Sequence, residues 1–94
     1  MAERASFSAT VYGRVQGVYF RAFVARHARS LGIAGWVQNR EDGRSVAVKA
    51  EGERAALDEL LSQLKVGPAE AQVNRVEVEW SKYSGAFSGF AIRH

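Results

Sequence analysis

The feature that most constrains this chain is a change of hydrophobic period across residues 13–21. Before this stretch, Phe7, Ala9 and Val11 alternate with polar residues, which is the period of a half-buried strand. After it, apolar side chains recur at helical spacing, at Phe20, Phe23, Val24, Ala28 and Leu31. The stretch has the sequence Gly-Arg-Val-Gln-Gly-Val-Tyr-Phe-Arg, without proline, so every residue in it carries a backbone N–H. The pattern predicts a strand that passes through a glycine loop directly into a helix.

A loop of consecutive amides at the start of a helix suits an anion, because the N–H groups add to the positive end of the helix dipole. Arg21 falls in the first predicted helical turn, where a cation interacts poorly with that dipole. A doubly negative group between Arg21 and the amides would explain this placement. The alternative is that Gly13 and Gly17 only let the chain turn and that Arg21 is a solvated surface residue. The sequence lacks the glycine signatures of nucleotide and dinucleotide sites, so the anion indicated is a small phosphate.

The composition excludes several kinds of site. The chain has no cysteine, which excludes disulfides, thiolate metal sites and cysteine nucleophiles. Neither His27 nor His94 has a carboxylate at ligand spacing, so we expect no metal site. We expect His27 to be a packed or rim histidine rather than a catalyst, and His94, the last residue of the sequence, to be mobile. Residues 1–6 are polar and no apolar run reaches the length of a membrane span, which favours a cytoplasmic location. The formal charge of +3 suits an anionic ligand but is also common on solvated surfaces.

The remainder of the sequence predicts more strands and a second helix. Residues 33–39 and 44–51 read as two strands of a hairpin, with Asp42-Gly43 as a tight turn between them. In the second of these strands, Lys49 and Glu51 lie on the face opposite the valines.

The second helix is predicted to open at Gly52-Glu53, which places an acidic residue in its first turn. Its apolar stripe consists of Leu57, Leu60, Leu61 and Leu64. Residues 73–80 predict a further strand, and residues 87–92 a short strand at an edge.

This order of elements predicts an α+β fold of the ferredoxin-like, split βαβ type. The pattern is βαββαβ plus a short terminal strand, with two helices on one face of a mostly antiparallel sheet. A doubly wound fold would need a helix after each strand, and the predicted hairpin breaks that order. No repeat, linker or low-complexity segment divides the chain, so we expect a single domain over residues 1–94.

Asn39 ends the second predicted strand, and in this fold that end approaches the glycine loop. Its side-chain amide both donates and accepts, so it could hold a water molecule in one orientation. The alternative is turn chemistry, since asparagine is common in hairpins shortly before Asp-Gly.

These motifs together resemble the paired signatures of the acylphosphatase family. The resemblance rests on residues 13–21 and on Gly35-Trp-Val-Gln-Asn39 with Asp42-Gly43, and it continues through residues 51–53, 67–68 and 89–92. It leaves out residues 1–6, and no motif position departs from the family pattern. It implies hydrolysis of acyl phosphates to a carboxylate and inorganic phosphate, without cofactor or metal.

The resemblance also implies roles for single residues. Arg21 and Asn39 would be catalytic: Arg21 binds the phosphoryl group, and Asn39 holds the attacking water. The backbone amides of seven loop residues would complete the phosphate site, namely Arg14, Val15, Gln16, Gly17, Val18, Tyr19 and Phe20.

The chemistry of these residues agrees with such an activity. No evident acid, base or nucleophile gathers at the loop, whereas cleavage of a phosphate ester usually needs one of them or a metal. An acyl phosphate leaves as a carboxylate, whose conjugate acid has a pKa of roughly 4, so it needs no proton at neutral pH. Stabilisation of the phosphoryl oxygens and a positioned water would suffice. Because an asparagine is too weak to act as a base, a phosphate oxygen of the substrate is a candidate for taking the proton of the water.

Two other functions stay open. One is a module of the same fold that binds phosphate or an RNA backbone, although residues 44–51, a central strand, have no aromatic side chain of the kind that stacks on RNA bases. The other is a sensor that binds acyl phosphates without turnover. We expect an acyl phosphate as substrate, phosphate as product or inhibitor, no nucleic acid or membrane partner, and a monomer.

Overall fold

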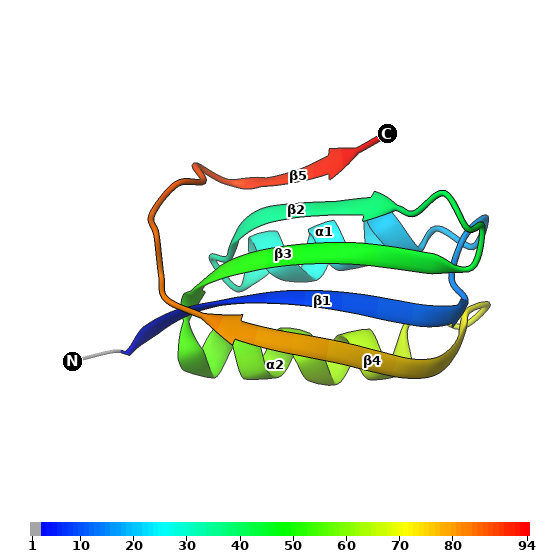
Figure 1. The fold of residues 1–94 in the computed structure, drawn as a ribbon, viewed down its shortest axis with the longest axis horizontal. Coiled ribbons are helices and arrows are strands. Elements are labelled where there is room, and N and C mark those ends of the chain that lie inside the picture. The colour runs from blue at the N-terminus through cyan, green and yellow to red at the C-terminus, as the bar shows by residue number, and fades with distance from the viewer. Residues whose placement is uncertain (1–2) are drawn as a thin grey trace.

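A computed structural model describes residues 3–94, which form one five-stranded sheet and two helices (Figure 1). In chain order the elements are β1 (Arg4–Arg14), α1 (Phe20–Ser30), β2 (Ala34–Asn39), β3 (Ser45–Glu53), α2 (Arg54–Val66), β4 (Gln72–Ser81) and β5 (Phe90–Arg93). The strand order is β4-β1-β3-β2-β5, and every neighbouring pair is antiparallel except β2 and β5, which are parallel. Both helices cover the same face (Figure 1), which confirms the ferredoxin-like α+β prediction. Of the predicted domain over residues 1–94, Met1 and Ala2 lie outside the described residues.

The core lies between this face and the apolar stripes of the helices. The predicted leucine stripe of α2 is buried in full, as are Phe7 and Val11 of the central strand β1. Helix α1 buries Phe20 and Val24, among others. Burial of side chains of this size contributes roughly 1.5–3 kcal/mol each, so α1 is held firmly against the sheet with its first residue beside the end of β1. Between residues 3 and 94, no helix has both the length and the apolar character needed to cross a membrane.

The boundary between β3 and α2 differs from the prediction. Strand β3 continues through Gly52 and Glu53, and α2 begins at Arg54 with no acidic residue in its first turn. The reason is strand pairing, because Gly52 lies opposite Ala5 and Glu53 opposite Arg4 of β1. The ladder holds both residues in extended conformation, so the predicted contribution of Glu53 to the first helical turn is wrong.

The connection between β2 and β3 is longer than the predicted tight turn and spans residues 40–44. The carboxylate of Asp42 accepts hydrogen bonds from the amide of Arg44 at 3.0 Å and from the hydroxyl of Ser45 at 2.7 Å. These bonds hold the pKa of Asp42 below its usual value, with the Ser45 hydroxyl as the largest cause. Asp42 therefore provides the turn chemistry of this hairpin.

The final strand starts at Phe90, three residues later than predicted. Gly89 precedes it in a loop conformation with φ of 129°, and its carbonyl accepts a hydrogen bond from Gly35 N at 2.9 Å. Pairing with β2 then begins at Gly35 and Phe90. Since β5 runs parallel to β2, the two strands end at the same edge of the sheet.

Glu51 lies on the predicted face of β3 but is only 2% exposed. The connection from β4 to β5 crosses the sheet at this end (Figure 1) and covers it. Its carboxylate accepts hydrogen bonds from Ser84 N at 2.9 Å, Ser84 Oγ at 2.7 Å and Gly85 N at 3.0 Å. Burial raises the pKa of Glu51, but the hydrogen bonds from Ser84 and Gly85 outweigh it, and the net pKa lies below the usual value. Glu51 is thus an ionised anchor for the crossing connection.

Candidate active site

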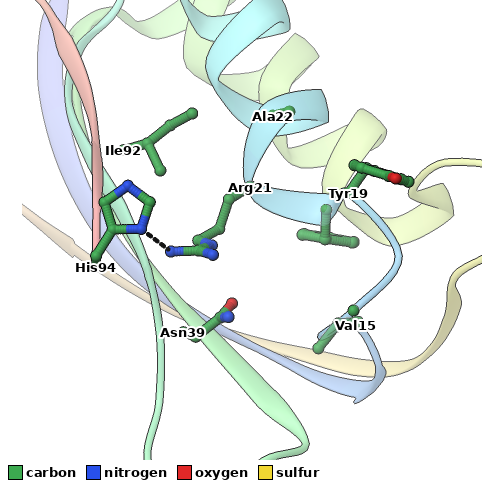
Figure 2. A pocket seen from close by; sticks show the side chains of 9 residues that line it. Val15, Tyr19, Arg21, Ala22, Asn39, Ile92 and His94 are labelled. Carbon is green, nitrogen blue, oxygen red and sulfur yellow. Dashed lines mark hydrogen bonds between the residues drawn. The ribbon is translucent and has the colours of Figure 1, made fainter.

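One pocket lies where the glycine loop, the end of β2 and the end of β5 meet (Figure 2). Its volume is about 430 Å³, and nine residues line it: Val15, Gly17, Tyr19, Phe20, Arg21, Ala22, Asn39, Ile92 and His94. The side chains of Arg21 and Asn39 extend into the same space from α1 and β2 (Figure 2). The structure therefore brings together the two side chains that the sequence singled out.

The backbone amides of residues 15–22 have no hydrogen-bond acceptor within the described chain. The first backbone hydrogen bond at the start of α1 runs from Phe23 N to Tyr19 O at 3.1 Å. Within residues 3–94, no acceptor receives a hydrogen bond from the backbone N–H of residues 15–22, and the N-cap residue Tyr19 supplies no side-chain cap. Consecutive free donors at a helix N-terminus make a site for an anion.

The backbone of the loop requires its two glycines. A Cβ at Gly13 would lie 2.0 Å from Gln72 O, so no side chain fits against β4 there. Gly17 has a φ of 73°, in the left-handed region that glycine adopts without cost. Tyr19 also has a positive φ, 61°, unlike any other non-glycine among the described residues. This conformation costs a tyrosine roughly 1–2 kcal/mol and turns the loop into the helix.

Other loop side chains hold the loop in place. Gln16 Nε2 donates to the carbonyls of Arg40 at 2.7 Å and Ser45 at 2.9 Å, which ties the loop to the β2–β3 connection. Val15 and Val18 are buried in the core. Of the seven predicted loop residues, Arg14, Gln16 and Val18 do not line the pocket. The anchoring role of the Gln16 side chain was not predicted, and nothing in the local sequence distinguishes it.

Arg21 is held by the end of β5. Its Nη1 donates to Arg93 O at 2.9 Å and lies 3.2 Å from His94 Nδ1. No aspartate or glutamate among the described residues forms an ion pair with Arg21 or lines the pocket. Its positive charge is therefore available to an anionic ligand.

The Asn39 side chain forms no hydrogen bond with the turn that follows it. It is half-buried and pairs with Val46 of β3, and its side chain forms no hydrogen bond within the described chain. The turn bonds come from Asp42 and Gln16 instead. The structure thus favours a role for the Asn39 amide in the pocket over the turn alternative.

The two histidines differ from each other. The His27 ring lies 4.5 Å from the Phe23 ring, centroid to centroid, which confirms a packed histidine. His94 lines the pocket, a placement that the sequence analysis did not foresee. Parallel pairing of β5 with β2 would have indicated it, since that pairing brings the chain after β5 to Asn39. Among residues 3–94, no group of three or more histidine and carboxylate side chains could hold a metal ion.

Comparisons with known proteins agree with these features. The acylphosphatase family model matches residues 7–92. An acylphosphatase of Salinibacter ruber is 49% identical over 86 residues, covering 92% of this chain and 90% of that protein. One from Anaeromyxobacter sp. is 47% identical over 94 residues, the full length of both. The crystal structure of the acylphosphatase from Bacillus subtilis has a TM-score of 0.91 at 38% identity, covering 96% of this chain and 99% of that one. The chain therefore belongs to the acylphosphatase family, and it is an acylphosphatase enzyme.

Proposed function

We propose that this chain hydrolyses acyl phosphates by direct attack of a water molecule, positioned by Asn39, on a phosphoryl group bound by Arg21 and the amides of the loop over residues 14–20. The observation that carries the proposal is one pocket that combines a run of free amides, an arginine without an ion-pair partner among the described residues, and a free side-chain amide. Within the described chain, the loop amides have no acceptor, Arg21 has no anionic partner and the Asn39 side chain has no hydrogen-bond partner. An acyl phosphate would supply the first two, and a water molecule the third.

The phosphoryl group would occupy the loop. Its oxygens accept hydrogen bonds from the loop amides and from Arg21, and such charge-assisted bonds are the stronger kind. Because Nη1 of Arg21 already donates to Arg93 O, Nε and Nη2 remain for the ligand. The Arg93 carbonyl thus fixes the plane of the guanidinium. A fixed, positively charged fork stabilises charge that develops on the phosphoryl oxygens in the transition state.

The attacking water would lie beside Asn39. The amide of Asn39 can donate to and accept from that water, which limits its rotation. Attack forms a bond between the water oxygen and phosphorus, and the bond from phosphorus to the acyl oxygen breaks with its electron pair. The carboxylate leaves, and a phosphoryl oxygen takes the proton of the water, so no protein group has to change protonation state.

This arrangement favours acyl phosphates over other phosphate compounds. No aspartate or glutamate among the described residues lines the pocket, so an alkoxide leaving group would find no carboxylic acid to protonate it. A carboxylate leaves without a proton at neutral pH. The rate should therefore depend steeply on the acidity of the leaving group.

The RNA-binding alternative finds no support on β3, a central strand of the sheet. On the open face of the sheet it presents Ala47 and Lys49 opposite Thr10 and Ser8 of β1, without an aromatic side chain among these four. Strand β3 therefore offers no platform for the base stacking by which this fold binds RNA. The aromatic residue of β1 on the same face, Tyr12, donates to Glu77 at 3.1 Å and lies under the Arg75 guanidinium.

The test is release of inorganic phosphate from benzoyl phosphate, a nitrophenyl phosphate and an alkyl phosphate, each with and without EDTA. We expect fast, EDTA-insensitive turnover of benzoyl phosphate, slow turnover of the aryl ester and almost none of the alkyl ester. Arg21→Ala protein purified in the same way controls for contaminating phosphatases. A magnesium requirement, or equal rates on acyl and alkyl phosphates, would contradict the mechanism; binding of phosphate without turnover would indicate a sensor.

A further inference from the structure

Helix α1 holds strand β5 at both ends. Near the C-terminal end of the helix, Arg29 donates from Nε and Nη2 to Phe90 O, at 3.1 and 2.9 Å. Near its N-terminal end, Arg21 donates to Arg93 O at 2.9 Å. The strand is therefore fixed along its length, and residue 94 is delivered to the pocket beside Arg21 (Figure 2).

The contact between Arg21 and His94 has a defined direction. Nη1 of Arg21 lies 3.2 Å from Nδ1 of His94. A guanidinium has donors and no acceptor, so this contact is a hydrogen bond when Nδ1 presents its lone pair and the ring proton is on Nε2. This is the neutral imidazole. A protonated ring has N–H groups at both nitrogens, cannot accept from Arg21 and carries the same charge.

Few charged groups surround the His94 ring. From α1 the group that faces it is Arg21, and from the loop the phenol of Tyr19 lines the same pocket. Strand β2 contributes Asn39, which is uncharged. The preceding residue, Arg93, places its guanidinium over the Trp36 ring, 4.6 Å from the centroid. No aspartate or glutamate among the described residues lines the pocket, so no acidic side chain there offsets the repulsion between Arg21 and a protonated His94.

From this geometry we propose that His94 is a positioning residue for Arg21, active in its neutral form. The ring and the Arg93 carbonyl together hold Nη1, so that Nε and Nη2 point to the phosphoryl group. Protonation of His94 breaks one of the two contacts and loosens the guanidinium. The inference rests on the proposed role of Arg21, and it adds a dependence of turnover on the protonation state of the imidazole.

The experiment is the pH dependence of kcat and KM for benzoyl phosphate from pH 5 to 8 at constant ionic strength. It compares the native protein with His94→Asn, whose Oδ1 can accept in place of Nδ1 without titrating, and with His94→Ala. His27→Asn is the matched control, because His27 packs on Phe23 outside the pocket. Ionisation of the substrate is common to all variants and cancels when each profile is divided by that of His94→Asn.

We expect the native protein to match His94→Asn at pH 8 and to fall below it by about 3- to 10-fold toward pH 5, mainly in kcat, the range expected for loss of one hydrogen bond. His94→Ala should be lower by a similar factor at every pH, and His27→Asn should follow the native profile. A His94→Asn profile identical to the native one, or full activity of His94→Ala at pH 8, would overturn the inference. If in addition Arg21→Ala were active, the proposed function itself would fail; an inactive Arg21→Ala would leave it standing.

Discussion

Two regions at opposite ends of the sheet present neighbouring backbone amides in different ways. At one end, the β4–β5 connection turns the amides of Ser84 and Gly85 toward the carboxylate of Glu51. At the other, the amides of residues 15–22 have no acceptor within the described chain. The same donor groups are satisfied by a built-in anion in one place and left free in the other.

The comparison separates a structural use of the peptide N–H from a proposed functional one. A buried donor without an acceptor costs free energy, so a chain that leaves several such donors free at one point needs solvent or a ligand there. The loop also contains the one non-glycine residue with a positive φ among those described, Tyr19. Unused donors and backbone strain therefore coincide at the pocket, whereas the Glu51 region has its hydrogen bonds complete.

The largest expected effect is at Arg21. Replacement by alanine should lower turnover of benzoyl phosphate by roughly 10²–10³-fold, because the free amides lose the cation that completes the site. Arg21→Lys should be nearly as damaging, since an ammonium cannot present two parallel donors to two phosphoryl oxygens. The measurement is kcat and KM for both variants, with the exposed Arg26→Ala of the same helix as control. Near-native activity of the lysine variant would show that Arg21 acts only as a general positive charge.

Asn39→Ala should come next, with a loss of turnover of roughly 10²-fold from a misplaced water. Inhibition by inorganic phosphate should hardly change, since Asn39 offers no charge to the anion. Gln38→Ala is the matched control, because the neighbouring residue on β2 points to the other face. Equal losses in turnover and in phosphate affinity would assign Asn39 to the turn instead of the water.

Glu51→Gln tests the end of the sheet where the amides of Ser84 and Gly85 have an internal acceptor. Removing the charge should lower the free energy of unfolding at pH 7 by about 1–3 kcal/mol, because three donors lose an ionised acceptor. The folded pKa of Glu51 is lowered, so its contribution is present above the unfolded pKa and is lost as the pH falls through the folded pKa. As the pH falls through the folded pKa of Glu51, the free energy of unfolding of the native protein should therefore decrease more than that of Glu51→Gln.

Denaturant unfolding across that pH range measures the Glu51 contribution, with the exposed Glu79→Gln as control. Identical acid dependence of the native protein and Glu51→Gln would contradict the anchor role. Turnover of Glu51→Gln well below its unfolding temperature should stay within about two-fold of native, as expected for a site away from the chemistry.

The smallest effect concerns Tyr19. Because asparagine tolerates a positive φ better than other non-glycine residues, Tyr19→Asn should raise the free energy of unfolding by up to about 1 kcal/mol. Tyr19→Val should lower it, since a branched side chain is strained there. Activity of Tyr19→Asn should be kept, because the amides keep their directions. Equal stability of the asparagine and valine variants would mean that Tyr19 does not hold this conformation in solution.

Local patterns in the sequence predicted most of the fold and drew attention to Arg21 and Asn39, whose catalytic roles came from the family resemblance. The alternation before Gly13, the leucines of α2 and the order of elements depend on neighbouring residues, and the predictions drawn from them are confirmed. Glu53 could not be assigned from its neighbours, because distant pairing with β1 keeps it extended. Burial of Glu51 depends on a segment more than thirty positions away. The place of His94 likewise follows from the parallel pairing of β5 rather than from the residues around it.

The most direct test of the account is a titration of the ¹⁵N-labelled protein with inorganic phosphate, followed through its backbone amide resonances. The account predicts large, saturable shifts for residues 15–22, no comparable shift for Ser84 and Gly85, and much weaker binding in Arg21→Ala. Small shifts spread evenly over the surface, or none at residues 15–22, would contradict the claim that the free amides of this loop bind the phosphoryl group.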